Sequence, residues 1–219
     1  MELKTGLTYL LLLTGLLAGP ASGQTLASEL AVYTIEAETS IIRVYVGRSG
    51  PLARLGHNHV IHSRELSGQI NLAQDRLNST GSFSFPVNSF VVDDASERER
   101  AGDAFESEPG ESAIEGTREN MLGVTVLNAD AYSEISVTAT PESISDDQWL
   151  LSLELAFQGN TISLEIPAQI ELTGSRFSVD ASFTLAHDDI GLSPFSALGG
   201  SLRVAEEIDF EMHIEASAQ

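Results

Sequence analysis

Residues 149–172 read WLLSLELAFQGNTISLEIPAQIEL. Two runs of alternating apolar and polar residues flank Gln158-Gly159-Asn160-Thr161, which favours a turn. Such alternation is typical of antiparallel strands with one buried and one solvated face. A turn of this kind between two such runs predicts a β-hairpin. The apolar faces of the two runs comprise Trp149, Leu151, Leu153, Leu155, Phe157, Ile162, Leu164, Ile166, Ala168, Ile170 and Leu172.

The same period of two continues along the chain beyond these residues. Thr173-Gly174-Ser175 separates the second run from a third, Phe177 to Leu185, so residues 149–185 are expected to form a meander. About eight such strands form either a sandwich or a closed barrel. The best runs exceed the usual five or six residues, which favours the tilted strands of an all-β antiparallel barrel. Further alternating positions are Ile42, Val44 and Val46; Phe83, Phe85 and Val87; and Ile208, Phe210, Met212 and Ile214.

The segment 95–122 breaks this rhythm because it is rich in Glu, Arg and Ala. We expect one or two short helices here, with Pro109-Gly110 as the break between them or between a helix and a mobile loop. Two interpretations stay open. The segment either covers the mouth of the barrel or is a charged, solvated insertion.

The N-terminus has the order of a secretory signal peptide: Lys4, an apolar run from about Leu7 to Ala18, and small residues at Ala21 and Gly23. The run is shorter than the roughly twenty residues that span a membrane, so a retained, stable membrane anchor is not expected. We predict that residues 1–23 are removed and that residues 24–219 form one exported domain, periplasmic or extracellular.

Composition excludes several function classes. The net charge of −21 repels phosphate backbones, so no nucleic-acid partner is expected. There is no cysteine and therefore no disulfide. The chain lacks the Gly-x-Ser-x-Gly, His-Glu-x-x-His, phosphate-loop and dinucleotide-binding motifs. We therefore expect neither an enzyme nor a cofactor, while a homodimer is compatible with the sequence.

One histidine-rich stretch, Leu55-Gly56-His57-Asn58-His59, has the His-x-His spacing that metal sites use. On a strand the two imidazoles would share a face, and His187 could add a third ligand if the fold brings it close. The alternative is an ordinary turn whose histidines hydrogen-bond to the backbone.

Several motifs, in order, resemble the YceI-like family of periplasmic proteins. They are Tyr33-Thr34-Ile35-Glu36, Arg54 to His59, Leu66 to Ile70, Arg118 to Leu122, Val126 to Ile135, and His187 to Ser196 with Leu198 to Leu202. The resemblance spans roughly Val32 to Ile214. It implies a lipocalin-like antiparallel barrel whose apolar channel takes a polyisoprenoid or similar long-chain lipid. It implies no catalytic residues.

The expected function is to bind such a ligand as a carrier or reservoir, because each buried methylene contributes about 0.8 kcal/mol. Two alternatives remain: a barrel filled by its own side chains with a structural or interaction role, and a metal-binding protein that uses His57, His59 and His187. The predicted ligand-binding residues are Phe83, Phe85, Trp149, Leu151, Leu153, Leu155, Phe157, Ile162, Leu164, Ile166 and Phe183.

Overall fold

The structure, a computed structural model, describes residues 30–219, so the predicted signal peptide lies outside the described residues. Twelve strands of the described part form one antiparallel sheet. The strands are β1 (Ala31–Ile35), β2 (Ile41–Ser49), β3 (His59–Ser63), β4 (Ser67–Leu72), β5 (Thr80–Pro86), β6 (Val91–Val92), β7 (Glu134–Ser145), β8 (Gln148–Phe157), β9 (Asn160–Thr173), β10 (Arg176–Ala186), β11 (Ser196–Ala197) and β12 (Leu202–Ala218).

Eight of these strands close into a ring, in the order β1-β4-β5-β7-β8-β9-β10-β12, and β12 pairs back onto β1. The 17-residue strand β12 makes this closure, because it changes partner along its length. Its residues 216–218 pair with β1, whereas its residues 203–213 pair with β2. The prediction of an all-β, lipocalin-like antiparallel barrel of about eight strands is therefore confirmed.

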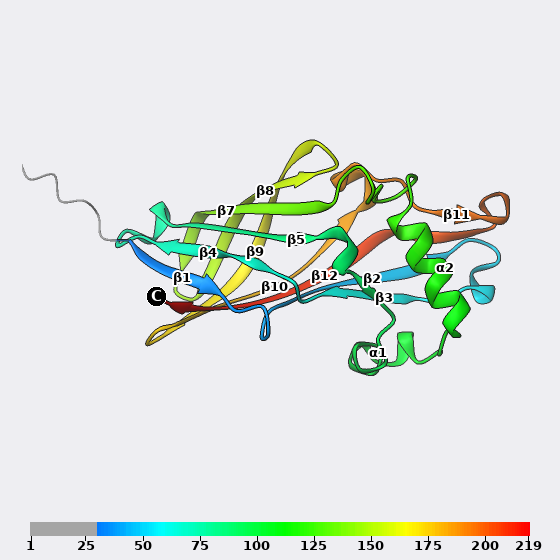
Figure 1. Ribbon diagram of the computed structural model, residues 1–219, viewed down its shortest axis with the longest axis horizontal. Helices are drawn as coiled ribbons and strands as arrows, with labels where there is room; N and C mark the ends of the chain where they lie inside the picture. Colours follow the sequence, from blue (N-terminus) through cyan, green and yellow to red (C-terminus); the bar gives the residue numbers. More distant parts are fainter. Residues whose placement is uncertain (1–29) are drawn as a thin grey trace, which may run out of the picture.

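The sheet continues beyond the ring of eight strands. β1 is followed by β2, β4 is preceded by β3, and β5 is followed by β6, so that β2, β3 and β6 extend the sheet beyond β12. Figure 1 shows β1 and the C-terminus at one end of the molecule and both α-helices at the other. We call these the closed end and the helix end.

The 95–122 segment, where one or two short helices were expected, contains two, α1 (Ala95–Ala101) and α2 (Glu111–Leu122). The Asp94 side chain caps α1 by accepting from the backbone amides of Ser96 and Glu97. α2 begins directly after Gly110, as the predicted break requires. No helix within residues 30–219 has the length and apolar character needed to cross a membrane.

The strands β8, β9 and β10 form the predicted meander, with positive φ angles at Gln158, Gly159 and Gly174 in its two turns. Pairing is continuous between β8 and β9, but β9 and β10 pair only through their hairpin, from Arg176↔Thr173 to Asp180↔Gln169. Beyond this point the two strands pair only with β8 and β12, respectively.

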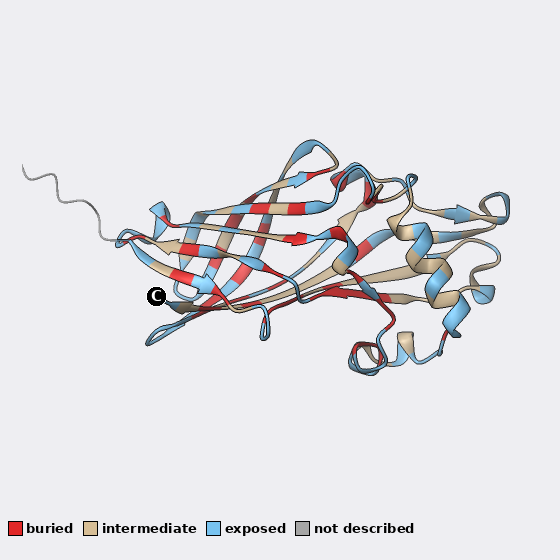
Figure 2. Ribbon diagram, viewed as in Figure 1, coloured by how far each residue is buried: buried red, intermediate tan, exposed pale blue. Residues whose placement is uncertain are grey.

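The core has two parts. Side chains fill the closed end, among them Tyr33, Trp149, Leu151, Ile170 and Phe177. A second cluster lies toward the helices. Figure 2 shows buried and exposed residues alternating along β8 and β9, while much of β2 and β12 toward the helix end is of intermediate burial.

Candidate ligand-binding site

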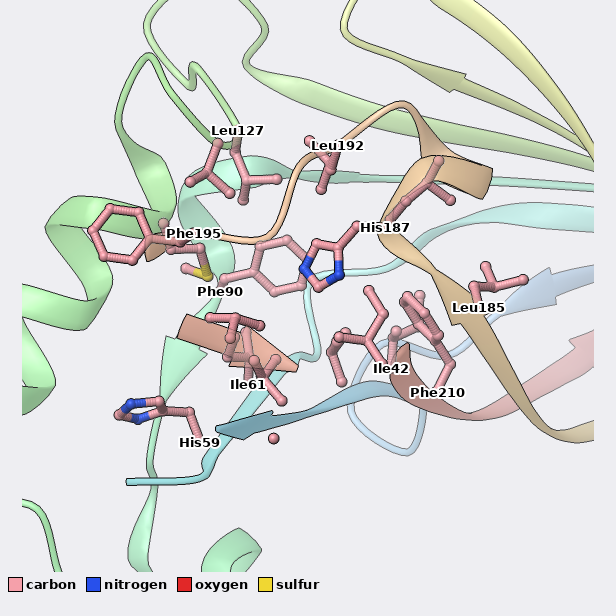
Figure 3. Close-up of a pocket in the computed structure, with 18 of the residues that line it drawn as sticks. Ile42, His59, Ile61, Phe90, Leu127, Leu185, His187, Leu192, Phe195 and Phe210 are labelled. Atoms are coloured by element: carbon pink, nitrogen blue, oxygen red, sulfur yellow. The ribbon is translucent and has the colours of Figure 1, made fainter. Parts of the chain in front are cut away.

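An apolar cavity of about 480 Å³ lies in the barrel between the two core clusters. Its volume falls within the range of roughly 300–1,000 Å³ that small-molecule sites occupy. Ile42, Val44 and Val46 of β2 face the cavity, and because they border empty space they are only half-buried. The alternation along β2 therefore marks a hollow interior rather than a packed one (Figure 3).

The structure separates the eleven predicted ligand-binding residues into two groups. Trp149 and Leu151 lie in the filled core of the closed end, 4% and 7% exposed. Ile162 packs against the second cluster without reaching the cavity wall. The residues that line the cavity are Phe83, Phe85, Leu153, Leu155, Phe157, Leu164, Ile166 and Phe183.

Sequence reasoning did not assign several other lining residues to the site. The lining residues on β2 and β12 lie in runs with a clear period of two. Periodicity, however, does not indicate which strands surround the cavity. Phe90, Met121 and Leu127 lie outside the long strands, where no periodic signal exists. Met121 and Thr117 of α2 line the cavity, so this helix covers the end of the barrel. Of the two interpretations of the 95–122 segment, α2 therefore follows the one in which it covers the mouth of the barrel.

A buried charge network fixes the histidine-bearing turn. The Asp93 carboxylate accepts from His59 Nδ1 at 2.6 Å and from the Val60 amide at 3.0 Å, and it pairs with the Arg98 guanidinium. Burial by itself would raise the pKa of Asp93, but the hydrogen bonds from His59 and Val60 outweigh it and hold that pKa below its usual value. Arg98 also donates to the carbonyls of Asn58 and Phe105.

This network orients the His59 ring toward the cavity. His59 Nε2 lies 3.5 Å from Thr117 Oγ1 of α2. The strand β3 begins at His59, so His57 lies in the preceding loop, with its ring centroid 6.4 Å from that of His59. Both histidines and His187 line the cavity, but among residues 30–219 no group of three or more His, Cys, Asp or Glu side chains is placed to hold a metal ion.

The outer face of β2 is also covered, which its sequence did not indicate. Glu97 of α1 accepts from Arg43 at 2.6 Å and from Arg64 at 3.0 Å. Burial opposes ionisation of Glu97, but the hydrogen bond and charge of Arg43 dominate and lower its pKa. Nearby, burial and the hydrogen bond to Glu211 raise the pKa of Tyr45 to about 12. Arg100 of α1 donates to the Tyr45 hydroxyl at 2.9 Å, so Arg43 and Tyr45 both anchor α1 outside the wall whose inner face lines the cavity.

Fold and site together define a lipocalin-like antiparallel barrel with an apolar cavity beneath a helix. The sequence model of the YceI-like domain matches residues 33–216, and the chain therefore belongs to the YceI-like family. No curated protein matches the chain.

Solved structures share the fold at low sequence identity. BcnA of Burkholderia cenocepacia has a TM-score of 0.60 at 11% identity, covering 84% of this chain and 99% of that chain. A polyisoprenoid binding domain from Saccharophagus degradans, implicated in plant cell wall breakdown, has a TM-score of 0.55 at 14% identity, covering 87% of this chain and 100% of that domain. A Campylobacter jejuni YceI protein has a TM-score of 0.50 at 14% identity, covering 73% and 84% of the two chains.

Proposed function

We propose that this protein binds a long-chain apolar molecule, such as a polyisoprenoid or another lipid, in the cavity and serves as its carrier or reservoir. The observation that carries the proposal is the contrast between the two halves of the barrel: the closed end is packed, whereas the helix end holds a cavity of about 480 Å³ walled by apolar side chains. A flexible hydrocarbon would gain about 0.8 kcal/mol per methylene buried there.

Family membership supports this proposal. The Saccharophagus degradans domain that shares the fold is described as polyisoprenoid binding. The filled-barrel alternative accounts for the closed end only. Binding needs no covalent step, and we propose that the ligand is held and released unchanged.

Organic extraction of the purified protein, followed by mass spectrometry, tests the proposal. We expect a long-chain lipid in about stoichiometric amount, or saturable uptake of a fluorescent fatty acyl or isoprenoid probe by the delipidated protein. Absence of both a co-purified lipid and saturable uptake would refute the proposal.

We further propose that the protein acts outside the inner membrane after removal of residues 1–23. This rests on the apolar run and the small residues Ala21 and Gly23. N-terminal sequencing of the exported protein should begin at or near Gln24. Recovery of an intact Met1 in the soluble cytoplasmic fraction would contradict it.

A further inference from the structure

His187 is a polar side chain set in the apolar wall of the cavity. It is the first residue of the 3-10 turn η5 (His187–Ile190), which directly follows β10, and it is only 7% exposed. Figure 3 shows its imidazole among the lining side chains, with Phe90, Ile42 and Leu192 labelled around it. A buried polar group in such surroundings needs hydrogen-bond partners.

One ring nitrogen of His187 has a partner. Nδ1 lies 2.8 Å from the carbonyl oxygen of Glu206, which can only accept a hydrogen bond. Nδ1 therefore carries the hydrogen. Glu206 lies on β12 where the register against β2 shifts between Val204 and Ile208, and this irregularity leaves its carbonyl available to the ring.

Among the described residues, the other nitrogen has no hydrogen-bond partner. With the hydrogen on Nδ1, the neutral imidazole presents Nε2 as an acceptor. No hydrogen bond to Nε2 forms within residues 30–219, and no carboxylate in this range forms an ion pair with His187. A hydroxyl head group would bring the donor that this atom lacks, whereas a carboxylate would bring a second acceptor to the neutral ring.

We propose that His187 is a specificity-determining residue that selects a ligand ending in a hydroxyl group, an alcohol or a phenol, by accepting its hydrogen bond at Nε2. This inference rests on the proposed function and deepens it. The hydrocarbon chain then runs from His187 toward Leu153 and Ile166, which line the cavity and belong to the closed-end core.

The test compares two probes that share one isoprenoid chain: farnesol, which carries a hydroxyl, and farnesyl methyl ether, which has no donor. Affinities are measured by calorimetry on the delipidated protein. We expect farnesol to bind roughly 2- to 12-fold more tightly, the ratio that corresponds to one neutral hydrogen bond. The side-chain ¹⁵N resonance of His187 Nε2 should move on addition of farnesol but not of the ether.

The variant His187→Asn separates recognition from structure. The Asn amide can occupy the place of Nδ1 and still donate to the Glu206 carbonyl, but it offers nothing at the place of Nε2. We expect the preference for farnesol to disappear in this variant. The matched control Glu165→Gln, on the exposed face of β9, should keep the preference.

The outcomes are distinguishable. Equal affinity of the wild type for both probes, an unmoved Nε2 resonance, or a preference that persists in His187→Asn would overturn the role of His187 while leaving lipid binding in place. Saturable binding of neither probe would overturn the proposed function itself, and the role of His187 with it.

Discussion

Leu151 and Leu155 lie four residues apart on the same face of β8, yet they border different interiors. Leu151 stands opposite Ile166, is 7% exposed and belongs to the filled core. Leu155 stands opposite Ile162, is half-buried and lines the cavity. The boundary between the packed and the hollow half of the barrel therefore passes between these two leucines.

This boundary gives a matched pair of variants. Leu155→Gln should weaken lipid binding roughly 5- to 150-fold, because a buried amide without partners costs about 1–3 kcal/mol in the bound complex. It should change the stability of the empty protein less than the same change in the filled core, because Leu155 borders empty space and the new side chain displaces no packed neighbour there. The measurements are probe titration and thermal unfolding.

Leu151→Gln, the same change in the filled core, should instead lower the free energy of unfolding by about 3 kcal/mol or more, through lost packing and an unsatisfied amide. Its folded fraction should keep the wild-type affinity for the probe. The cavity assignment fails if the two variants behave alike in both measurements.

Asp93 should be essential for stability at the helix end. Asp93→Asn leaves the buried Arg98, which is 7% exposed, without its counter-charge. The free energy of unfolding, measured by chemical denaturation, should therefore fall by about 3–5 kcal/mol. Asn accepts the positive φ of 57° at this position, so the loss would report charge and not backbone strain. The control is Asp94→Asn, because Asn is also a good helix cap. Its free energy of unfolding should stay within about 0.5 kcal/mol of the wild-type value. Equal stability of the two variants would argue against the network.

Stability should fall as the pH drops below about 6.5, and His62 is the cause. His62 lies on β3 on the face opposite Ile61. Burial lowers its pKa, although Glu97 and Asp94 oppose this and Arg64 and Arg43 favour it. Between the lowered pKa and the ordinary value of about 6.5, the unfolded chain binds a proton that the folded protein does not, so the free energy of unfolding decreases with falling pH.

His62→Leu removes this titration and the ring nitrogen Nδ1, which is buried without a partner among the described residues. Denaturation between pH 7 and 5 should therefore show a flatter pH dependence in the variant than in the wild type. Below about pH 4.5 both proteins should lose stability, because the lowered pKa values of Glu97 and Asp93 favour the folded state only while these groups are ionised. An unchanged slope between pH 7 and 5 would rule out His62 as its source.

Gly68 should tolerate no side chain. A Cβ there would collide with the carbonyl oxygen of Ser82 and lie 2.6 Å from Cα of Phe83, both backbone atoms of the neighbouring strand β5. Gly68→Ala should therefore destabilise the protein by about 1–3 kcal/mol or prevent folding. In Gly81→Ala the new Cβ meets only side chains at 3.9 Å, and we expect a neutral or slightly stabilising effect. Thermal unfolding followed by circular dichroism measures both effects. Equal melting temperatures of the Gly68→Ala and Gly81→Ala variants would contradict the close approach of Gly68 to β5.

The sequence by itself determined the strands and their faces. From Trp149 to Leu185 the period of two and the Gly-containing turns gave the meander and the side of each strand that is buried, because alternate residues of a strand face opposite sides whatever the topology. Pro109-Gly110 likewise marked the start of α2, although α1 already ends at Ala101. The order of motifs from Tyr33 to Leu202 pointed to the family that the domain match confirms.

Only the tertiary structure decided which buried faces enclose empty space. Leu151 and Leu155 have the same residue type and the same alternation, yet Leu151 packs in the filled core and Leu155 lines the cavity. The exchange of β1 for β2 along β12 is likewise a long-range pairing with no local signal. The partners of His187 and Asp93 depend equally on contacts between distant segments. Glu206 of β12 contacts His187 of η5, and His59 and Val60 of β3 contact Asp93, and such hydrogen bonds exist only once these segments are brought together by folding.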